Sequence, residues 1–132
     1  MKCEIISIGD ELLIGQTINT NASWLGEQLN NLGFTIGHGL VISDQKTDIF
    51  NALIQAENRS DIVIITGGLG PTNDDITKHT LTEYFNTALE LDKEIEQNII
   101  EYFTNRNLPI LQTNKDQALL PKACQVLPNS RG

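Results

Sequence analysis

Three short apolar runs alternate with segments of helical spacing, and this alternation constrains the fold more than any other feature of the sequence. The runs CEIISI (3–8), FTIGHGLVI (34–42) and DIVIIT (61–66) are rich in β-branched residues, which is typical of buried strands. The last run is apolar on both faces, so we expect it to be a central strand. Apolar residues at helical spacing predict a helix after each strand, over residues 22–32, 47–57 and about 74–85.

This order of strands and helices implies right-handed crossovers between parallel strands. We therefore predict an α/β fold of three layers, α/β/α, with a mostly parallel central sheet and helices on both faces. Asn21 is the expected N-cap of the first helix and Gly33 its end. Trp24 and Leu32 belong to the apolar face of that helix by their spacing.

The pattern changes beyond residue 85. Residues 89–91 are expected to be extended and residues 93–105 to form a helix. Thr113 and Asp116 resemble a capping box for one more short helix. The stretch CQVL (124–127) is a candidate for a last strand.

Composition and charge limit the possible partners. A length of 132 residues, 39% of them hydrophobic, fits one domain over residues 1–132. Because no helix is expected after the last strand, we expect this domain to be truncated at its C-terminal end, as in a fragment of a longer protein. The formal net charge of -8 argues against nucleic acid or an anionic membrane as a partner.

Cysteine, histidine and hydropathy patterns argue against a disulfide-bonded, zinc-binding, secreted or membrane-spanning protein. Cys3 and Cys124 are expected to be reduced thiols, and His38 and His79 have no partner at zinc-ligand spacing. The N-terminus does not resemble a signal peptide, and no apolar run approaches the ~20 residues of a membrane helix. We therefore predict a cytoplasmic protein.

Polar residues and glycines follow all three predicted strands. Parallel strands share one carboxyl edge, which is where open α/β sheets bind their ligands. Asp10 and Glu11 follow the first strand and Asp44 follows the second. The third strand leads into TGGLGPTNDD (66–75), which contributes Gly67, Gly68, Gly70, Asn73, Asp74 and Asp75.

This combination predicts a site for a phosphate and a metal. Glycines let a ligand approach backbone N–H groups, and the N-terminus of the following helix favours an anion. Clustered carboxylates would repel that anion unless they bind a hard cation, so we expect a divalent metal, Mg²⁺ or else Co²⁺ or Mn²⁺. The candidate metal ligands are Asp10, Glu11, Asp44 and Asp75, and one carboxylate could act as general base.

Several of these residues have a purely structural alternative. Asp74 could be only a helix cap, Asp44 could cap the second helix or form an Asx turn, and Gly67 and Gly68 could form a tight turn and nothing more. Lys78 could neutralise phosphate charge or be a solvated side chain. A further group, whose members could contact a sugar or base or could simply cap the first helix, consists of Thr17, Asn19, Thr20 and Asn21.

Two familiar nucleotide motifs do not fit the glycine loop. No Gly-Lys-Ser/Thr follows it, so it is not a Walker A sequence. Asn73 stands where the third glycine of a dinucleotide fingerprint belongs, and the loop follows the third strand instead of the first.

Two long motifs instead resemble a known family. IGDELLIGQTINTNASWLGEQLNNLG (8–33) and TGGLGPTNDDITK (66–78) are similar to the competence/damage-inducible protein A (CinA) family, as are SD (43–44), NKDQALLP (114–121) and the final PNSRG. The resemblance covers essentially the whole chain. It implies a homo-oligomer, a dimer or trimer, with the molybdopterin-binding fold of molybdopterin adenylyltransferases and gephyrin.

The resemblance also implies a site and an activity. In the pterin-binding relatives the glycine loop holds the phosphate end of the ligand, which corresponds here to Gly67, Gly68, Gly70 and Asp75. Asp44 and Asp75 correspond to the acidic pair of the metal-linked chemistry, so they are the candidate catalytic residues. For CinA-type proteins the implied reaction is metal-dependent hydrolysis of ADP-ribose to AMP and ribose 5-phosphate. Molybdopterin binding with adenylyl transfer, and a non-catalytic interaction domain linked to competence, are the alternatives.

Overall fold

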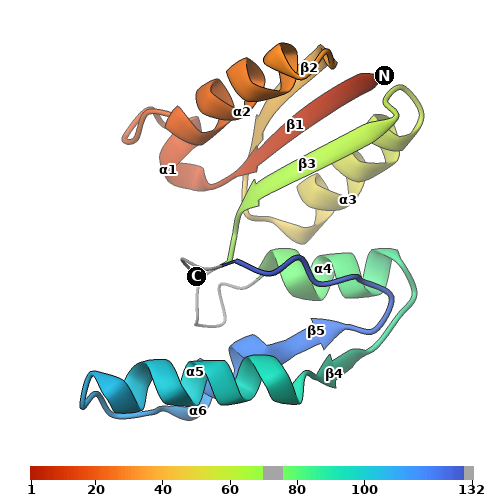
Figure 1. The fold of residues 1–132 in the computed structure, drawn as a ribbon. Coiled ribbons are helices and arrows are strands. Elements are labelled where there is room, and N and C mark those ends of the chain that lie inside the picture. The colour runs from red at the N-terminus through yellow and green to blue at the C-terminus, as the bar shows by residue number, and fades with distance from the viewer. Residues whose placement is uncertain (70–75, 130–132) are drawn as a thin grey trace. The chain divides into compact units, whose positions relative to one another are not determined.

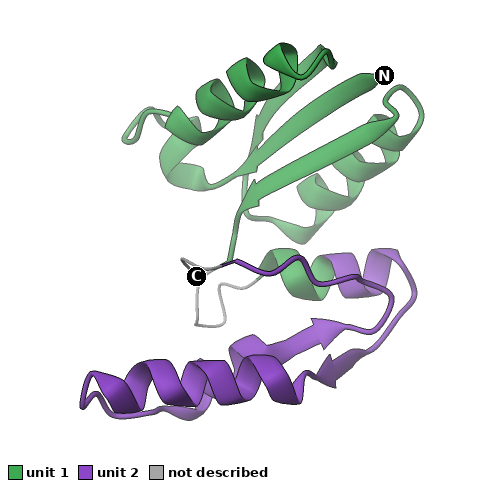
Figure 2. Ribbon diagram, in the orientation of Figure 1, with its two compact units in different colours: residues 1–80 green, residues 81–132 purple. Residues whose placement is uncertain are grey.

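The computed structural model describes residues 1–69 and 76–129 of the chain, which divide into two compact units, Met1–Thr80 and Leu81–Gly132 (Figure 2). Unit 1 contains a parallel three-stranded sheet flanked by helices, and unit 2 contains a two-stranded antiparallel sheet and further helices (Figure 1). The elements of unit 1 are β1 (Lys2–Ile8), α1 (Asp10–Leu13), α2 (Thr20–Asn31), β2 (Thr35–Ile42), α3 (Lys46–Glu57) and β3 (Ile62–Gly67). Helix α4 (Ile76–Tyr84) runs from unit 1 into unit 2, whose other elements are β4 (Leu89–Leu91), α5 (Lys93–Asn105), α6 (Gln112–Lys115), the 3₁₀ helix η1 (Asp116–Ala118) and β5 (Leu119–Pro121).

The sheet of unit 1 has the strand order β2-β1-β3, with both pairs parallel. The chain moves from β1 to β2 in one direction and from β2 to β3 in the other, so right-handed crossovers place α2 and α3 on opposite faces of the sheet. The predicted α/β class with a parallel sheet and helices on both faces is therefore confirmed.

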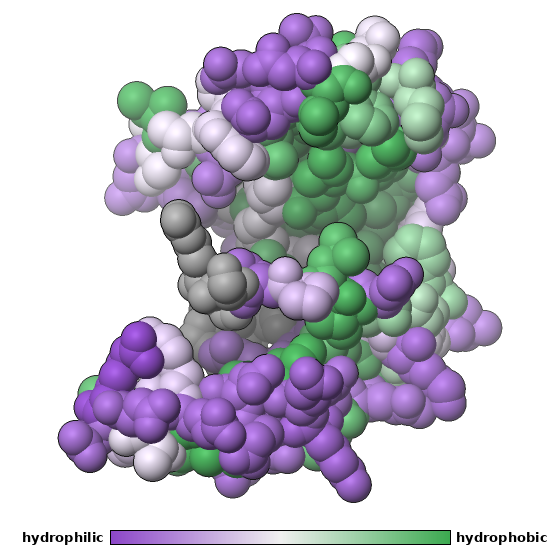
Figure 3. Space-filling model, in the orientation of Figure 1, coloured by the Kyte–Doolittle hydropathy of each residue, from purple (hydrophilic) through white to green (hydrophobic). Residues whose placement is uncertain are grey.

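Strand β1 lies at the centre of this sheet, and every residue from Cys3 to Ile8 is buried. Four residues of α3 supply the other large part of the core. The expectation that residues 61–66 form a central strand is wrong for the described sheet, because β3 lies at its edge and is only half-buried. Because β3 is only half-buried, hydrophobic side chains are exposed over the sheet of unit 1. Figure 3 shows them gathered over the strands of unit 1 on the visible face.

Helix α2 starts earlier than the sequence indicates. The side chain of Asn19 accepts a hydrogen bond from Ala22 N at 3.1 Å, so Asn19 is the N-cap and the prediction of Asn21 as the cap is wrong. The helix ends before Gly33 as expected, with φ +86° at that glycine. Trp24 and Leu32 are 61% and 74% exposed, so the apolar face of α2 is narrower than its spacing indicates.

Unit 2 departs most from the sequence-based expectations. The short helix after residue 111 exists, but its start is fixed by a hydrogen bond from Leu111 N to Asn114 Oδ1 and not by Thr113 and Asp116. The last strand is β5, which pairs with β4 from Leu91↔Leu119 to Leu89↔Pro121. Residues 124–127 are exposed and are not part of a described sheet, so the prediction of a strand there is wrong. No helix among residues 1–69 and 76–129 is long and apolar enough to cross a membrane.

Candidate functional site

The carboxyl ends of the three parallel strands lie side by side. Ile8 at the end of β1 pairs with Ile42 of β2 and with Gly67 of β3. The N–H of Gly9 donates to the Ile42 carbonyl at 3.1 Å, which keeps the chain at this edge as it leaves β1. The segments that follow the strands therefore begin at a common edge, as the parallel topology requires.

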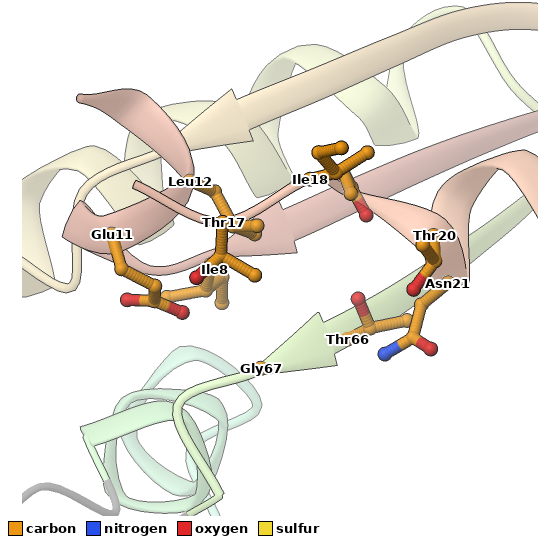
Figure 4. A pocket seen from close by; sticks show the side chains of 10 residues that line it. Ile8, Glu11, Leu12, Thr17, Ile18, Thr20, Asn21, Thr66 and Gly67 are labelled. Atoms are coloured by element: carbon orange, nitrogen blue, oxygen red, sulfur yellow. The ribbon is translucent and has the colours of Figure 1, made fainter. Parts of the chain in front are cut away.

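A pocket of about 170 Å³ opens at this edge, between the end of the sheet and the segment that leads from α1 into α2. Its floor includes Ile8 and Gly67, and its apolar wall includes Leu12 and Ile18. Figure 4 shows Glu11 at one end of the lining and Thr20, Asn21 and Thr66 at the other. The predicted candidate residues among its lining are Glu11, Thr17, Asn19, Thr20, Asn21 and Gly67.

Two of these side chains have different local roles. The amide oxygen of Asn19 is occupied by the cap of α2, so this residue shapes the turn at the rim. Asn21 lies in the first turn of α2, is exposed, and lines the pocket. The alternatives of capping and ligand contact are thus divided between the two asparagines, with Asn21 the one free of the capping role.

The turn after β3 admits only glycine at two positions. Gly67 and Gly68 have φ values of +95° and +62°, a backbone region that most residues with a side chain rarely adopt. A Cβ atom on Gly67 would overlap the Ile8 carbonyl, and one on Gly68 would overlap the Thr77 hydroxyl. The close packing of this turn on β1 and α4 is therefore the structural reason for the Gly-Gly pair.

Asp44 lies in the connection between β2 and α3 and is half-buried. The N-cap of α3 is Gln45, which makes no side-chain cap hydrogen bond. The hydroxyl of Ser43 joins this connection to the helix, because Ser43 Oγ donates to Asp48 Oδ2 at 2.5 Å and accepts from Gln45 N at 3.2 Å. No hydrogen bond joins the Asp44 carboxylate to another described residue, so neither the helix cap nor the Asx turn is observed. A second hollow of about 360 Å³ lies beside this connection, lined by Ser43 of the connection, by Leu13 of α1 and by residues of β2 and α3, among them Asp48.

The remaining predicted site residues are not among the described lining of the pocket. Asp10 is the exposed first residue of α1, and Lys78 lies half-buried in the first turn of α4. Gly70, Asn73, Asp74 and Asp75 lie outside the described residues. Within the described part of the chain, no three Asp, Glu, His or Cys side chains come together as a metal site. Glu11 and Asp44 have the donor type that a hard cation prefers, and a complete ligand set would need further groups such as Asp75.

Sequence reasoning left Thr66 and Thr77 without a role at this edge. Thr66, the last residue of β3 before the glycines, lines the pocket. Thr77 is buried in the first turn of α4, where its hydroxyl donates to the Gly67 carbonyl at 3.0 Å. Thr66 could have been identified from the alternation of side chains at the strand end, whereas Thr77 is recognisable only once the path of the turn is known.

Comparison with known proteins identifies the class of protein to which this arrangement of strands and pocket belongs. A family described as "Probable molybdopterin binding domain" matches residues 4–126. The fold is that of a tungsten cofactor synthesizing protein, MoaB, from Pyrococcus furiosus, with a TM-score of 0.59 and 23% identity over 80% of this chain and 63% of that one.

Two further relatives are more similar. The chain is 48% identical to a CinA-like protein of Flavobacterium psychrophilum over its whole length, which is 32% of that relative. The crystal structure of CinA from Thermoplasma acidophilum superimposes with a TM-score of 0.84 at 30% identity, over 99% of this chain and 76% of that one. The chain belongs to the CinA family and carries its molybdopterin-binding-like domain. It spans about a third of the length of the curated relative that it matches.

Proposed function

We propose that this domain binds a nucleotide diphosphate sugar at the carboxyl edge of its sheet and hydrolyses it in a reaction that depends on a divalent metal. The observation that carries the proposal is the pocket at the ends of β1 and β3, where a carboxylate, Glu11, and several uncharged hydrogen-bonding side chains meet the glycine turn. The substrate that we propose is ADP-ribose, which the resemblance to CinA-type proteins implies.

The residues that line the pocket form groups that suit different parts of the ligand. Asn21, Thr17 and Thr66 offer amide and hydroxyl groups that suit the hydroxyls of a ribose or the edge of a base. Ile8 of the floor, together with Leu12 and Ile18 of the apolar wall, offers an apolar surface against which a flat ring can pack. The glycine turn offers backbone N–H groups to the diphosphate. This division matches a ligand with one sugar or base end and one phosphate end.

The carboxylates supply the remaining part of the proposal. We assign metal binding to Asp44 and Asp75, with Glu11 and Asp10 as further candidates, and we propose Asp74 as a candidate contact of the ligand. A divalent metal held by these carboxylates would neutralise charge on the diphosphate and would make water more acidic at the site. In the overall reaction water adds to one phosphorus, the P–O–P bridge breaks, and AMP and ribose 5-phosphate leave as two phosphomonoesters.

The test is ³¹P NMR of ADP-ribose incubated with the chain and Mg²⁺ or Co²⁺, with an EDTA control. Asp44→Asn and Asp75→Asn are expected to abolish turnover. Glu27→Gln is the matched control, because Glu27 is an exposed carboxylate on α2 outside the pocket lining. We expect metal-dependent replacement of the diphosphate signals by two phosphomonoester signals. Turnover that persists in EDTA, or in both aspartate variants, would contradict the proposal.

Molybdopterin binding is the second candidate. It is favoured by the family match over residues 4–126 and by the likeness of the fold to MoaB. The same pocket would then hold a pterin against its apolar wall, with the phosphate of the pterin at the glycine turn. Fluorescence titration with molybdopterin separates the two functions, since binding of the pterin without hydrolysis of ADP-ribose would support this candidate over the first.

A further inference from the structure

One threonine side chain fixes the direction of the turn that follows β3. Thr77 is 2% exposed, and its hydroxyl donates a hydrogen bond to the Gly67 carbonyl at 3.0 Å. Its backbone N–H donates to the next carbonyl, that of Gly68, at 3.4 Å. Two consecutive carbonyls of the glycine turn are therefore held by a single residue of α4.

The peptide geometry converts these two bonds into a direction for the N–H groups. The described peptide bonds are all trans, so each N–H points opposite to the carbonyl of the same peptide unit. With the carbonyls of Gly67 and Gly68 directed to Thr77, the N–H groups of Gly68 and Leu69 are directed away from it. Two successive N–H groups on the same side of a turn are the donors that an anionic oxygen needs.

The fit between the turn and the threonine is also steric. The Thr77 hydroxyl occupies the volume that a Cβ atom on Gly68 would need. Glycine at position 68 and a short hydroxyl side chain at position 77 therefore depend on each other. A longer side chain at position 77 would push the turn away from α4, and a side chain without a hydroxyl would leave the carbonyl of half-buried Gly67 without its side-chain donor.

We infer that Thr77 is a positioning residue, which orients the Gly68 and Leu69 N–H groups toward a phosphate oxygen of the ligand without touching the ligand. This inference rests on the proposed function of the carboxyl edge as a phosphate site. It assigns a role to a residue that lies outside the carboxylates and the pocket lining.

The same helix contains a natural control. Thr80 lies three residues further along α4 and is 1% exposed, yet its hydroxyl has no hydrogen-bond partner in the described structure. Thr77→Val and Thr80→Val each remove one buried hydroxyl while keeping the shape of the side chain. Only the first of the two removes a bond to the glycine turn.

The experiment compares Thr77→Val, Thr77→Ser and Thr80→Val in amide NMR titrations with inorganic pyrophosphate and with ADP-ribose in the presence of Mg²⁺, recorded before ADP-ribose is turned over. In the wild type and Thr80→Val, both probes are expected to shift the Gly68 and Leu69 amide signals. Thr77→Val is expected to bind each probe roughly tenfold more weakly, the effect of about one hydrogen bond. Thr77→Ser, which keeps the hydroxyl, is expected to restore affinity to within about twofold of the wild type.

The outcomes separate this inference from the proposed function. An affinity of Thr77→Val equal to that of the wild type would overturn the inference. Amide signals of Gly68 and Leu69 that do not shift when pyrophosphate is added to the wild type would also overturn it. Should Thr77→Val not fold, the wild-type titration and Thr77→Ser still decide the matter. If pyrophosphate binding depends on Thr77 but ADP-ribose is not hydrolysed, the proposed reaction is contradicted and the role of Thr77 is supported.

Discussion

The guanidinium of Arg59 donates two hydrogen bonds to the buried carboxylate of Glu4, from Nη2 to Oε1 at 2.6 Å and from Nε to Oε2 at 2.9 Å. Ser60 Oγ donates a third bond to Oε2 at 3.1 Å, and the imidazole of His38 lies 3.8 Å from the same oxygen. This cluster joins the first half of β1 to β2 and to the connection between α3 and β3, toward the end of the sheet opposite the pocket. The hydrogen bonds from Arg59, supported by Ser60 and by the charges of Arg59 and His38, hold the pKa of Glu4 below its ordinary value despite burial.

The cluster predicts a specific pH dependence of stability. Because the pKa of Glu4 is lower in the folded than in the unfolded chain, its contribution is present above the unfolded value of about 4.3 and is lost as pH falls through the folded pKa. Glu4→Gln is expected to lower Tm at pH 7 by roughly 5 °C. Thermal unfolding followed by circular dichroism from pH 7 to pH 3 should show the two curves converging at low pH. A constant difference over that range would contradict the role of the Glu4 charge.

The cap of α2 provides a second prediction. Asn19→Ala is expected to lower the free energy of unfolding by about 1 kcal/mol, because the N–H of Ala22 loses its acceptor. Asn21→Ala removes the same side chain two residues later and is expected to change stability by less than about 0.5 kcal/mol. Urea unfolding of both variants measures the difference, and equal losses would place the cap elsewhere.

The glycines of unit 1 divide into two kinds. Gly67→Ala is expected to cost more than about 3 kcal/mol or to prevent folding, because the new Cβ would overlap the Ile8 carbonyl at a positive φ. Gly26 lies inside α2 with nothing within 4 Å of its Cβ position, so Gly26→Ala is expected to stabilise by about 1 kcal/mol. Urea unfolding of the two variants checks both signs, and similar effects would be at odds with the geometry of the turn.

The two cysteines are expected to differ in reactivity. Cys3 is buried in β1, where desolvation raises the pKa of its thiol, whereas Cys124 is exposed. Because the thiolate is the reactive form, iodoacetamide at pH 8 should label Cys124 in the native chain and label Cys3 only after unfolding in urea. Mass spectrometry counts the labels, and rapid native labelling of Cys3 would mean that β1 opens far more easily than its burial indicates.

The strands and long helices of unit 1 were predictable because β-branched runs and helical spacing are local signals. The central place of β1 was not, since the runs 3–8 and 61–66 are equally apolar and only their pairing distinguishes them. Asn19 and Asn21 could each have capped α2, and the choice depends on the path of the preceding turn. Residues 124–127 read as a strand by composition, but a strand also needs a partner, which sequence periodicity does not reveal.

The candidate site was predictable to the extent that topology alone brings strand ends together. Glu11 was expected at this edge, and Thr17 and Asn21 were expected to contact a ligand or to cap the first helix; all three line one pocket. Asp44 was expected at the same edge and follows β2, yet it lies outside the described lining of that pocket. The part played by Thr77 depends on two carbonyl directions, and no pattern of residue types encodes them.

The central claim, that the pocket at the ends of β1 and β3 binds the ligand, is tested most directly by an amide NMR titration of the wild-type chain with ADP-ribose in the presence of Mg²⁺, recorded while the ³¹P signals of the diphosphate are still intact. The reporters are the amides of Thr17, Asn21 and Gly67 at the pocket, with those of Glu4 and Ser60 at the opposite end of the sheet as the reference. We predict saturable shifts of the pocket amides with the reference amides unchanged. Shifts confined to the reference end, or no shifts at millimolar ligand, would contradict the claim.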